Sequence, residues 1–321
     1  MFAVRGVAVS FSIFFIFYGV LTLAVGLVWR RVWNYRRHDS ARSCADALFV
    51  LRMIPWGVST VVTLAFAVPS FLLLEPRAVR ESMSPVLVVL CLCGVAVMLA
   101  GMWNAAAALV RAARTVGRWS NGACVIGRSE ADSAQPVLLL RTAGAVPPLT
   151  AAGILRASVW LSEAAEFVLT ERELQCALRH EVVHVRRRDN LRKLLLRVAA
   201  SPGMTQLESA WREATEMAAD DAAVSNASEA LDLAAAVIKL SRLAPLEPVG
   251  ELTTALVHNP AEVVNARVER LIEWTEQRQR ALSNYSLRYS LCAAAGVVAT
   301  LAVTYSTLLV RVHAATEWLV R

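Results

Sequence analysis

Residues 170–189, TERELQCALRHEVVHVRRRD, decide how the centre of this chain folds. Thr170 is followed three residues later by Glu173, which is the capping-box pattern that begins a helix. Apolar residues then recur at helical spacing and predict one buried face: Leu174, Ala177, Leu178 and Val182. The sequence therefore predicts a half-buried helix that carries the segment HEVVH at residues 180–184.

That segment has the H-E-x-x-H pattern of zinc peptidases. Residues four apart lie above one another on one face of a helix, so His180 and His184 can reach the same metal ion. Glu181 is offset by one position and can act as general base on a water molecule bound to that metal. The neighbouring valines, Val182, Val183 and Val185, provide the uncharged surroundings that such a site needs. We therefore expect a zinc (Zn²⁺) site here.

Catalytic zinc usually takes three protein ligands and a water molecule. A second helix, predicted over residues 205–226, offers five carboxylates: Glu208, Glu213, Glu216, Asp220 and Asp221. Glu216 and Asp220 share one face of it, and Glu213 lies on the same side. One carboxylate can bind the metal while another holds a histidine by its second ring nitrogen. Spacing alone does not choose between Glu213 and Glu216, and it also allows all five to be solvated surface charges.

Composition predicts that much of the remaining chain lies in a membrane. Hydrophobic residues make up 56% of the sequence, charged residues only 18%, and the mean hydropathy is +0.48. A helix needs about 20 apolar residues to cross a bilayer. Four runs meet this requirement and predict four transmembrane helices, at residues 7–29, 54–74, 86–110 and 291–310.

The spans divide the chain into three predicted parts: residues 1–112 with three spans, residues 113–287 as one domain, and residues 288–321 with the fourth span and a short tail. Arginines crowd the connection after the first span, at Arg30, Arg31, Arg36, Arg37 and Arg42. Because basic connections face the cytoplasm, we expect the domain in the cytoplasm, both termini outside, and the protein in the inner (plasma) membrane. The same arginines account for the net charge of +7, so no direct nucleic-acid binding is expected.

Within the predicted domain, short strands are expected at residues 136–141 and 158–162, on either side of the turn-rich stretch 142–153. This pattern favours a small antiparallel sheet. Its edge could receive a substrate peptide as an added strand, or the strands could form a structural hairpin that caps the metal helix. The apolar stretch 191–200 contains charges, cannot span a bilayer, and fits the membrane interface. Loops are predicted at 120–135 and 244–259, and further helices at 229–243 and 261–280.

Two runs together resemble a known family. LRHEVVHVRRRDNL at residues 178–191 and WREATEMAADDAAV at residues 211–224 are similar to the peptidase domain of the BlaR/MecR family, membrane zinc metallopeptidases that sense β-lactams. The run VPPLTAAGILRASVWLS at residues 146–162 resembles the family's approach to its metal helix, and the four-span layout agrees with it. The resemblance covers most of the chain. It implies a mainly α polytopic membrane protein with a cytoplasmic, zincin-like α+β metallopeptidase domain.

The resemblance also implies a role for each site residue: zinc ligands His180, His184 and Glu216, general base Glu181, and supporting acids Asp220 and Asp189. The implied substrate is a DNA-binding repressor or the peptidase itself, in a signalling relay. Antibiotic-sensing members carry an extracellular penicillin-binding domain after the fourth span, and we expect no such sensor before Arg321. The same Glu-x-x-x-Asp helix occurs in HtpX-like quality-control proteases. A further alternative is a signal transducer whose metal site is structural. Neither the activating signal nor the oligomeric state is predicted.

Overall fold

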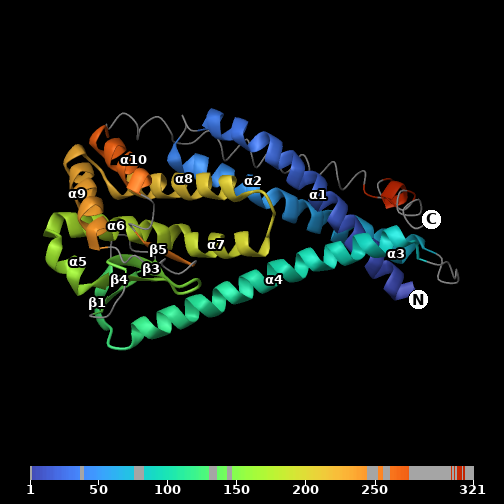
Figure 1. Ribbon diagram of the computed structural model, residues 1–321, viewed down its shortest axis with the longest axis horizontal. Helices are drawn as coiled ribbons and strands as arrows, with labels where there is room; N and C mark the ends of the chain where they lie inside the picture. The colour runs from blue at the N-terminus through green and yellow to red at the C-terminus, as the bar shows by residue number, and fades with distance from the viewer. Residues whose placement is uncertain are drawn as a thin grey trace.

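The protein is mostly helical, with a small sheet at one end of an elongated molecule (Figure 1). The computed structural model describes residues 2–36, 40–75, 83–129, 136–142, 147–243, 252–255, 261–274, 305, 307, 309–312 and 314. Three helical stretches are long and apolar enough to cross a membrane: Phe2–Tyr35, Ala41–Leu74 and Pro85–Ser120. They contain the first three predicted spans. The fourth, at residues 291–310, lies almost wholly outside the described residues.

The candidate spans pack as one bundle in which α1 contacts both α2 and α4. At Gly94 of α4 the approach is so close that a Cβ atom would collide with the backbone carbonyl of Phe11, so this contact needs a residue without a side chain. The second span begins well before its predicted start, because Ser40 caps its first turn by accepting from the Ser43 amide. The elements are α1 (Phe2–Arg36), α2 (Ala41–Val62), the π-helix η1 (Thr63–Ala67), α3 (Val68–Leu74) and α4 (Pro85–Ser120).

The sheet is mixed, with strand order β1-β2-β4-β3-β5. Its strands are β1 (Cys124–Ser129), β2 (Val137–Thr142), β3 (Leu149–Ala152), β4 (Ser158–Ser162) and β5 (Thr253–Ala255). Both expected strands are present as β2 and β4, but the prediction that the sheet is antiparallel was wrong, because this pair runs parallel. The reason is β3, which forms within the stretch predicted as turn and makes an antiparallel hairpin with β4. β2 therefore pairs with the other side of β4.

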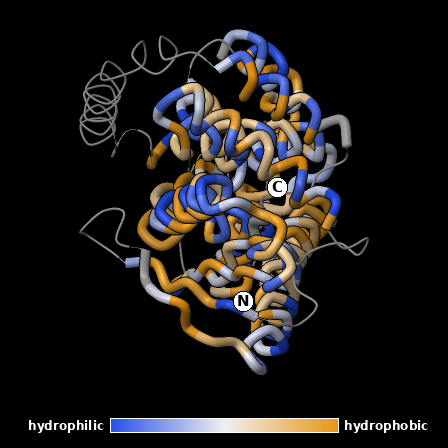
Figure 2. The backbone as a smooth tube through the Cα atoms, turned by 90° about the vertical axis from the view of Figure 1, so that its left-hand side faces the viewer, coloured by the Kyte–Doolittle hydropathy of each residue, from blue (hydrophilic) through white to orange (hydrophobic). Residues whose placement is uncertain are grey.

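Six further helices complete the half of the molecule that contains the sheet: α5 (Glu163–Val168), α6 (Glu171–Arg187), α7 (Asp189–Val198), α8 (Thr205–Ala223), α9 (Ala227–Leu243) and α10 (Ala261–Ile272). The capping box of α6 is confirmed, since Thr170 and Glu173 exchange both hydrogen bonds. The sheet, α6 and α9 share a core that includes Val137, Leu161, Ala177, Leu233 and Val237. Viewed end-on, hydrophobic and hydrophilic stretches alternate along this half (Figure 2), as in helices with one buried face.

Helices α7 and α8 pack directly on the candidate spans. In Figure 1, α6 and α7 follow one another across the middle, with α8 above them and α4 below. Leu207 and Trp211 of α8 lie in one core with Leu48 of α2 and Val25 of α1. Gly101 of α4 admits the backbone carbonyl at the end of α7. The two halves therefore share a hydrophobic core.

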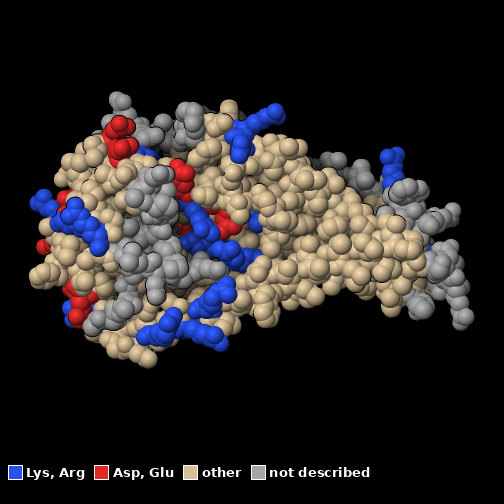
Figure 3. Space-filling view, in the orientation of Figure 1, with Lys and Arg blue, Asp and Glu red and all other residues tan. Residues whose placement is uncertain are grey.

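Polar contacts fasten the connection between α7 and α8 to the same spans. Arg52 of α2 is buried and donates to the Ser201 hydroxyl over 3.0 Å. Tyr18 of α1 donates to the Ala200 carbonyl and also contacts Ser201, 2.7 Å away. A buried arginine in an apolar span needs such partners, because an unpaired charge there is costly. On the face shown in Figure 3, charged side chains gather on the half that contains the sheet, and the spans are almost bare of them.

Candidate metal centre

Three of the predicted ligand side chains converge on one point. His180 and His184 project from α6, and Glu216 reaches them from α8. The two Nε2 atoms are 3.1 Å apart, and the Glu216 carboxylate oxygens lie 3.5 Å from His180 Nε2 and 3.6 Å from His184 Nε2. Both histidines are buried, and Glu216 is largely buried. The two histidines share one face of α6, as their spacing predicts. The packing of α8 against that face brings the Glu216 carboxylate to them.

Each histidine has an aspartate carboxylate beside its second ring nitrogen, Nδ1. Asp189 Oδ2 lies 2.7 Å from His184 Nδ1, and Asp220 Oδ1 lies 3.0 Å from His180 Nδ1. Asp189 reaches its position because Arg188 adopts a left-handed conformation (φ 55°), which ends α6 and turns the chain back. The hydrogen bond to Asp189 keeps the His184 ring proton on Nδ1 and leaves its Nε2 lone pair free to bind a metal, and Asp220 is placed to do the same for His180.

This donor set fits a zinc ion. When both ring protons lie on Nδ1, two Nε2 lone pairs and a carboxylate face one another here, and one cation between them can bind all three. Tetrahedral zinc with bonds of about 2.0–2.1 Å places its ligand atoms roughly 3.3 Å apart, close to the three separations observed. Burial lowers the pKa of His180, but Asp220 and Glu216 outweigh it and raise that pKa to about 9. The acids therefore favour positive charge at this point, as a proton on His180 or as a bound cation.

Glu181, the predicted general base, is completely buried beside the cluster. Within the described residues no side chain donates a hydrogen bond to its carboxylate oxygens, and the backbone of Ala151 lies close enough to lower its pKa. Burial raises the pKa of Glu181 to about 7, although His184 and His180 act in the opposite direction. A carboxylate whose pKa lies near neutrality is suited to accept and return a proton.

Arg267 of α10 is a site residue that the sequence analysis did not single out. It is 2% exposed, and it donates to Asp220 through Nε (2.9 Å) and Nη2 (2.6 Å). Its Nη1 lies 3.2 Å from Glu216. The sequence feature that could have identified it is its place on the apolar face of the helix, between Val264 and Leu271. An arginine on a buried face needs a buried partner. Arg267 balances the negative charge of the two acids.

The other acids of α8 have different surroundings. Glu213 lies outside the cluster and lines a groove beside Trp29 and Trp33, so within the described part of the chain Glu216 is the carboxylate placed to bind a metal. Asp221 pairs with Arg270, and Glu208 pairs with Arg212.

Comparison with known proteins found no family model and no curated protein that matches this sequence. The centre is therefore defined by its own residues. These are two histidines one helical turn apart, a carboxylate from a second helix, an aspartate behind each histidine, and a buried glutamate beside them.

Replacing Asp189 by Asn tests the support behind His184. Asn keeps the shape but removes the charge that fixes the ring proton, so the affinity for zinc should fall by about 10- to 100-fold. Competition with a chromophoric chelator measures it. Glu213→Gln is the matched control, since Glu213 lies on α8 outside the cluster and its loss should leave zinc affinity unchanged. Wild-type affinity in Asp189→Asn would show that this contact does not support the centre.

Proposed function

We propose that this protein is a zinc endopeptidase of the inner membrane, of the BlaR/MecR type, which cleaves proteins at a zincin-like site on the cytoplasmic face. One observation carries the proposal: His180, His184 and Glu216 converge with metal-ligand spacing beside the buried carboxylate of Glu181. Structural zinc sites are usually closed by four protein ligands. Three converge here among the described residues, which favours a catalytic site over a structural one.

The chain's own residues supply the proton transfers of peptide hydrolysis. A zinc ion in this centre contributes Lewis acidity, which polarises a substrate carbonyl and makes a water molecule easier to deprotonate. Glu181 takes the proton from the attacking water and later delivers it to the leaving amine. Asp189 and Asp220 hold the two imidazoles in the required orientation.

Substrate binding is proposed at the edge of β3, beside α6. In the structure this edge is occupied by β5 of the same chain, which pairs antiparallel with β3 and places Thr254 opposite Ala151. Ala151 also lies close enough to Glu181 for its backbone amide to lower the pKa of that residue. Lys193 of α7 donates to the Thr253 carbonyl over 2.7 Å and holds β5 in place. A substrate peptide added as a strand would take the position that β5 occupies. The presence of β5 at this edge therefore favours the hypothesis that the chain itself is one substrate.

Self-cleavage near β5 is therefore an expected result. Purified full-length protein, incubated with zinc in lipid nanodiscs, should acquire a new N-terminus within or close to residues 252–255. N-terminal peptide mapping by mass spectrometry detects it. The Glu181→Gln protein, prepared in parallel, should stay intact. Cleavage at this place in both proteins would indicate a contaminating protease and would remove this support.

The proposed partner is a cytoplasmic repressor, and the alternative is a broad quality-control protease of the HtpX type. Comparison of newly formed protein termini in cells that express the wild type or Glu181→Gln separates them. A relay predicts one principal cytosolic target, whereas quality control predicts many unrelated membrane proteins. If the two strains show the same protein termini and the same signalling response, the protein is instead a signal transducer with a structural metal site.

A further inference from the structure

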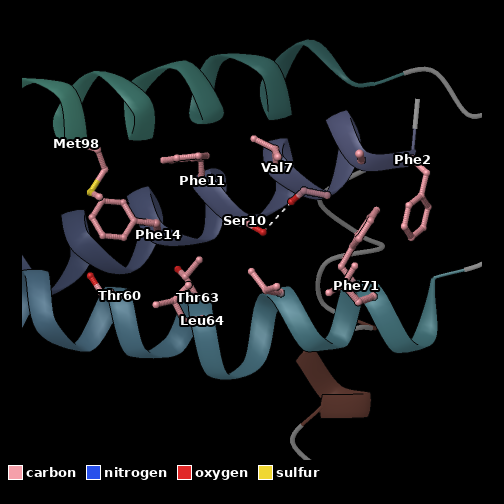
Figure 4. Close-up of a pocket in the computed structure, with 14 residues that line it drawn as sticks. Phe2, Val7, Ser10, Phe11, Phe14, Thr60, Thr63, Leu64, Phe71 and Met98 are labelled. Atoms are coloured by element: carbon pink, nitrogen blue, oxygen red, sulfur yellow. Dashed lines mark hydrogen bonds between the residues drawn. The ribbon is translucent and has the colours of Figure 1, made fainter.

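A cavity of about 490 Å³ lies between α1, the η1–α3 segment and α4 (Figure 4). It is at the end of the spans farthest from the sheet (Figure 1). Its size falls within the roughly 300–1,000 Å³ of pockets that bind small molecules. The wall is almost entirely apolar, and its larger members are Phe2, Phe11, Phe14, Leu64, Phe71 and Met98.

One polar atom of the wall points to a ligand. Three hydroxyls line the cavity, and two are engaged: Ser10 donates to the Gly6 carbonyl over 2.7 Å, and Thr60 donates to the Trp56 carbonyl over 2.8 Å. The third, on Thr63, has no hydrogen-bond partner among the described residues, although Thr63 is only 9% exposed. A buried hydroxyl without a partner is unfavourable, and a ligand acceptor in the cavity would satisfy it.

The helix is also distorted at this point. Thr63 is the first residue of the π-helix η1 (Thr63–Ala67), which interrupts the span between α2 and α3. Single π-turns inside helices are rare and occur frequently at functional sites. The unengaged hydroxyl and the π-turn thus coincide at one residue of the cavity wall.

Depth in the membrane selects the kind of ligand. Thr63 lies twelve residues before Glu75, the first charged residue after the span, which is about 18 Å along a helix. The hydrocarbon core is only about 30 Å thick, so phospholipid ester carbonyls at its surface do not reach this depth. The acceptor must belong to a molecule dissolved in the hydrocarbon. The four phenylalanine rings and Met98 favour a planar ring in that molecule.

We propose that this cavity binds a membrane-dissolved carbonyl compound with a planar ring, of the quinone class, and that Thr63 donates a hydrogen bond to its carbonyl oxygen. The cavity and the metal centre lie at opposite ends of the fold, so this site does not depend on the proposed peptidase activity.

A matched pair of probes tests the proposal on full-length protein in phosphatidylcholine nanodiscs. The first probe is 2,3-dimethyl-1,4-naphthoquinone, whose substituted ring does not add thiols, and the second is 2,3-dimethylnaphthalene, which has the same skeleton without carbonyls. Binding is measured by equilibrium dialysis against empty nanodiscs. Thr63→Val should weaken binding of the quinone about tenfold and leave binding of the hydrocarbon unchanged.

The control variant is Thr60→Val, which removes a hydroxyl of the same cavity that already has a partner, and it should bind both probes as the wild type does. Ser10→Phe fills the cavity and should abolish binding of both, while retained zinc binding shows that the protein is folded. The proposal is overturned if the wild type takes up no more quinone than empty nanodiscs do, or if Thr63→Val binds the quinone normally. A tightly held phospholipid that excludes the quinone would also overturn it.

Discussion

The Glu181→Gln protein is expected to bind zinc as the wild type does and to cleave about 10²- to 10⁴-fold more slowly, the range that general-base catalysis usually contributes. Gln has nearly the same shape as Glu but cannot accept a proton at neutral pH. The ligand atoms belong to His180, His184 and Glu216, which this change does not touch. Zinc content by elemental analysis, together with the rate of cleavage near β5, measures both effects.

The matched control for this variant is Glu171→Gln, which changes an exposed glutamate in the first turn of the same helix. It should retain both zinc and activity. If Glu181→Gln cleaves as fast as the wild type, Glu181 is not the base. If it loses zinc as well as activity, its carboxylate is needed to hold the metal, and the proposed division of roles is wrong.

The second large effect is expected at Arg267. Replacing it by Leu leaves the buried carboxylates of Asp220 and Glu216 without their cation, and removing one partner of a buried ion pair typically costs about 3–5 kcal/mol. Arg270 offers an internal comparison, since it joins the same two helices through Asp221 but at a more exposed position. Arg270→Leu should cost less than Arg267→Leu, because water reaches the Arg270–Asp221 pair.

Denaturant titration of the detergent-solubilised protein measures this difference in the free energy of unfolding. The double variant Arg267→Leu/Asp220→Asn should recover part of the loss, because it removes one of the two charges left unpaired. Equal losses for Arg267→Leu and Arg270→Leu would show that burial does not set the strength of these pairs.

Helix α6 could be predicted from the sequence because the features that define it are local. The capping pair Thr170 and Glu173, the apolar spacing and the two histidines all lie within one helix. The choice between Glu213 and Glu216 could not be made from spacing, because both lie on one side of α8 and only the packing of α8 on α6 decides which of them reaches the histidines.

The parts that could not be predicted depend on contacts between distant residues. The parallel pairing of β2 with β4 follows from the presence of β3, a strand too short to be recognised in a turn-rich stretch. Arg267 and Asp220 are 47 residues apart in the sequence. The apolar spacing of its helix therefore indicates that Arg267 is buried, but it does not indicate which acid pairs with it. The early start of the second span could not be predicted because Arg52 interrupts the apolar run, and its hydrogen-bond acceptor, Ser201, lies in a distant connection.

The shared core between α8 and the spans has a mechanical consequence. α8 is one uninterrupted helix from Leu207, which lies in that core, to Glu216 at the metal centre, a distance of about 14 Å. A continuous helix of this length is stiff, so its two ends move together. A tilt of α1 and α2 that displaces its Leu207 end would therefore be transmitted along α8 to Glu216, with no loop between them to absorb it.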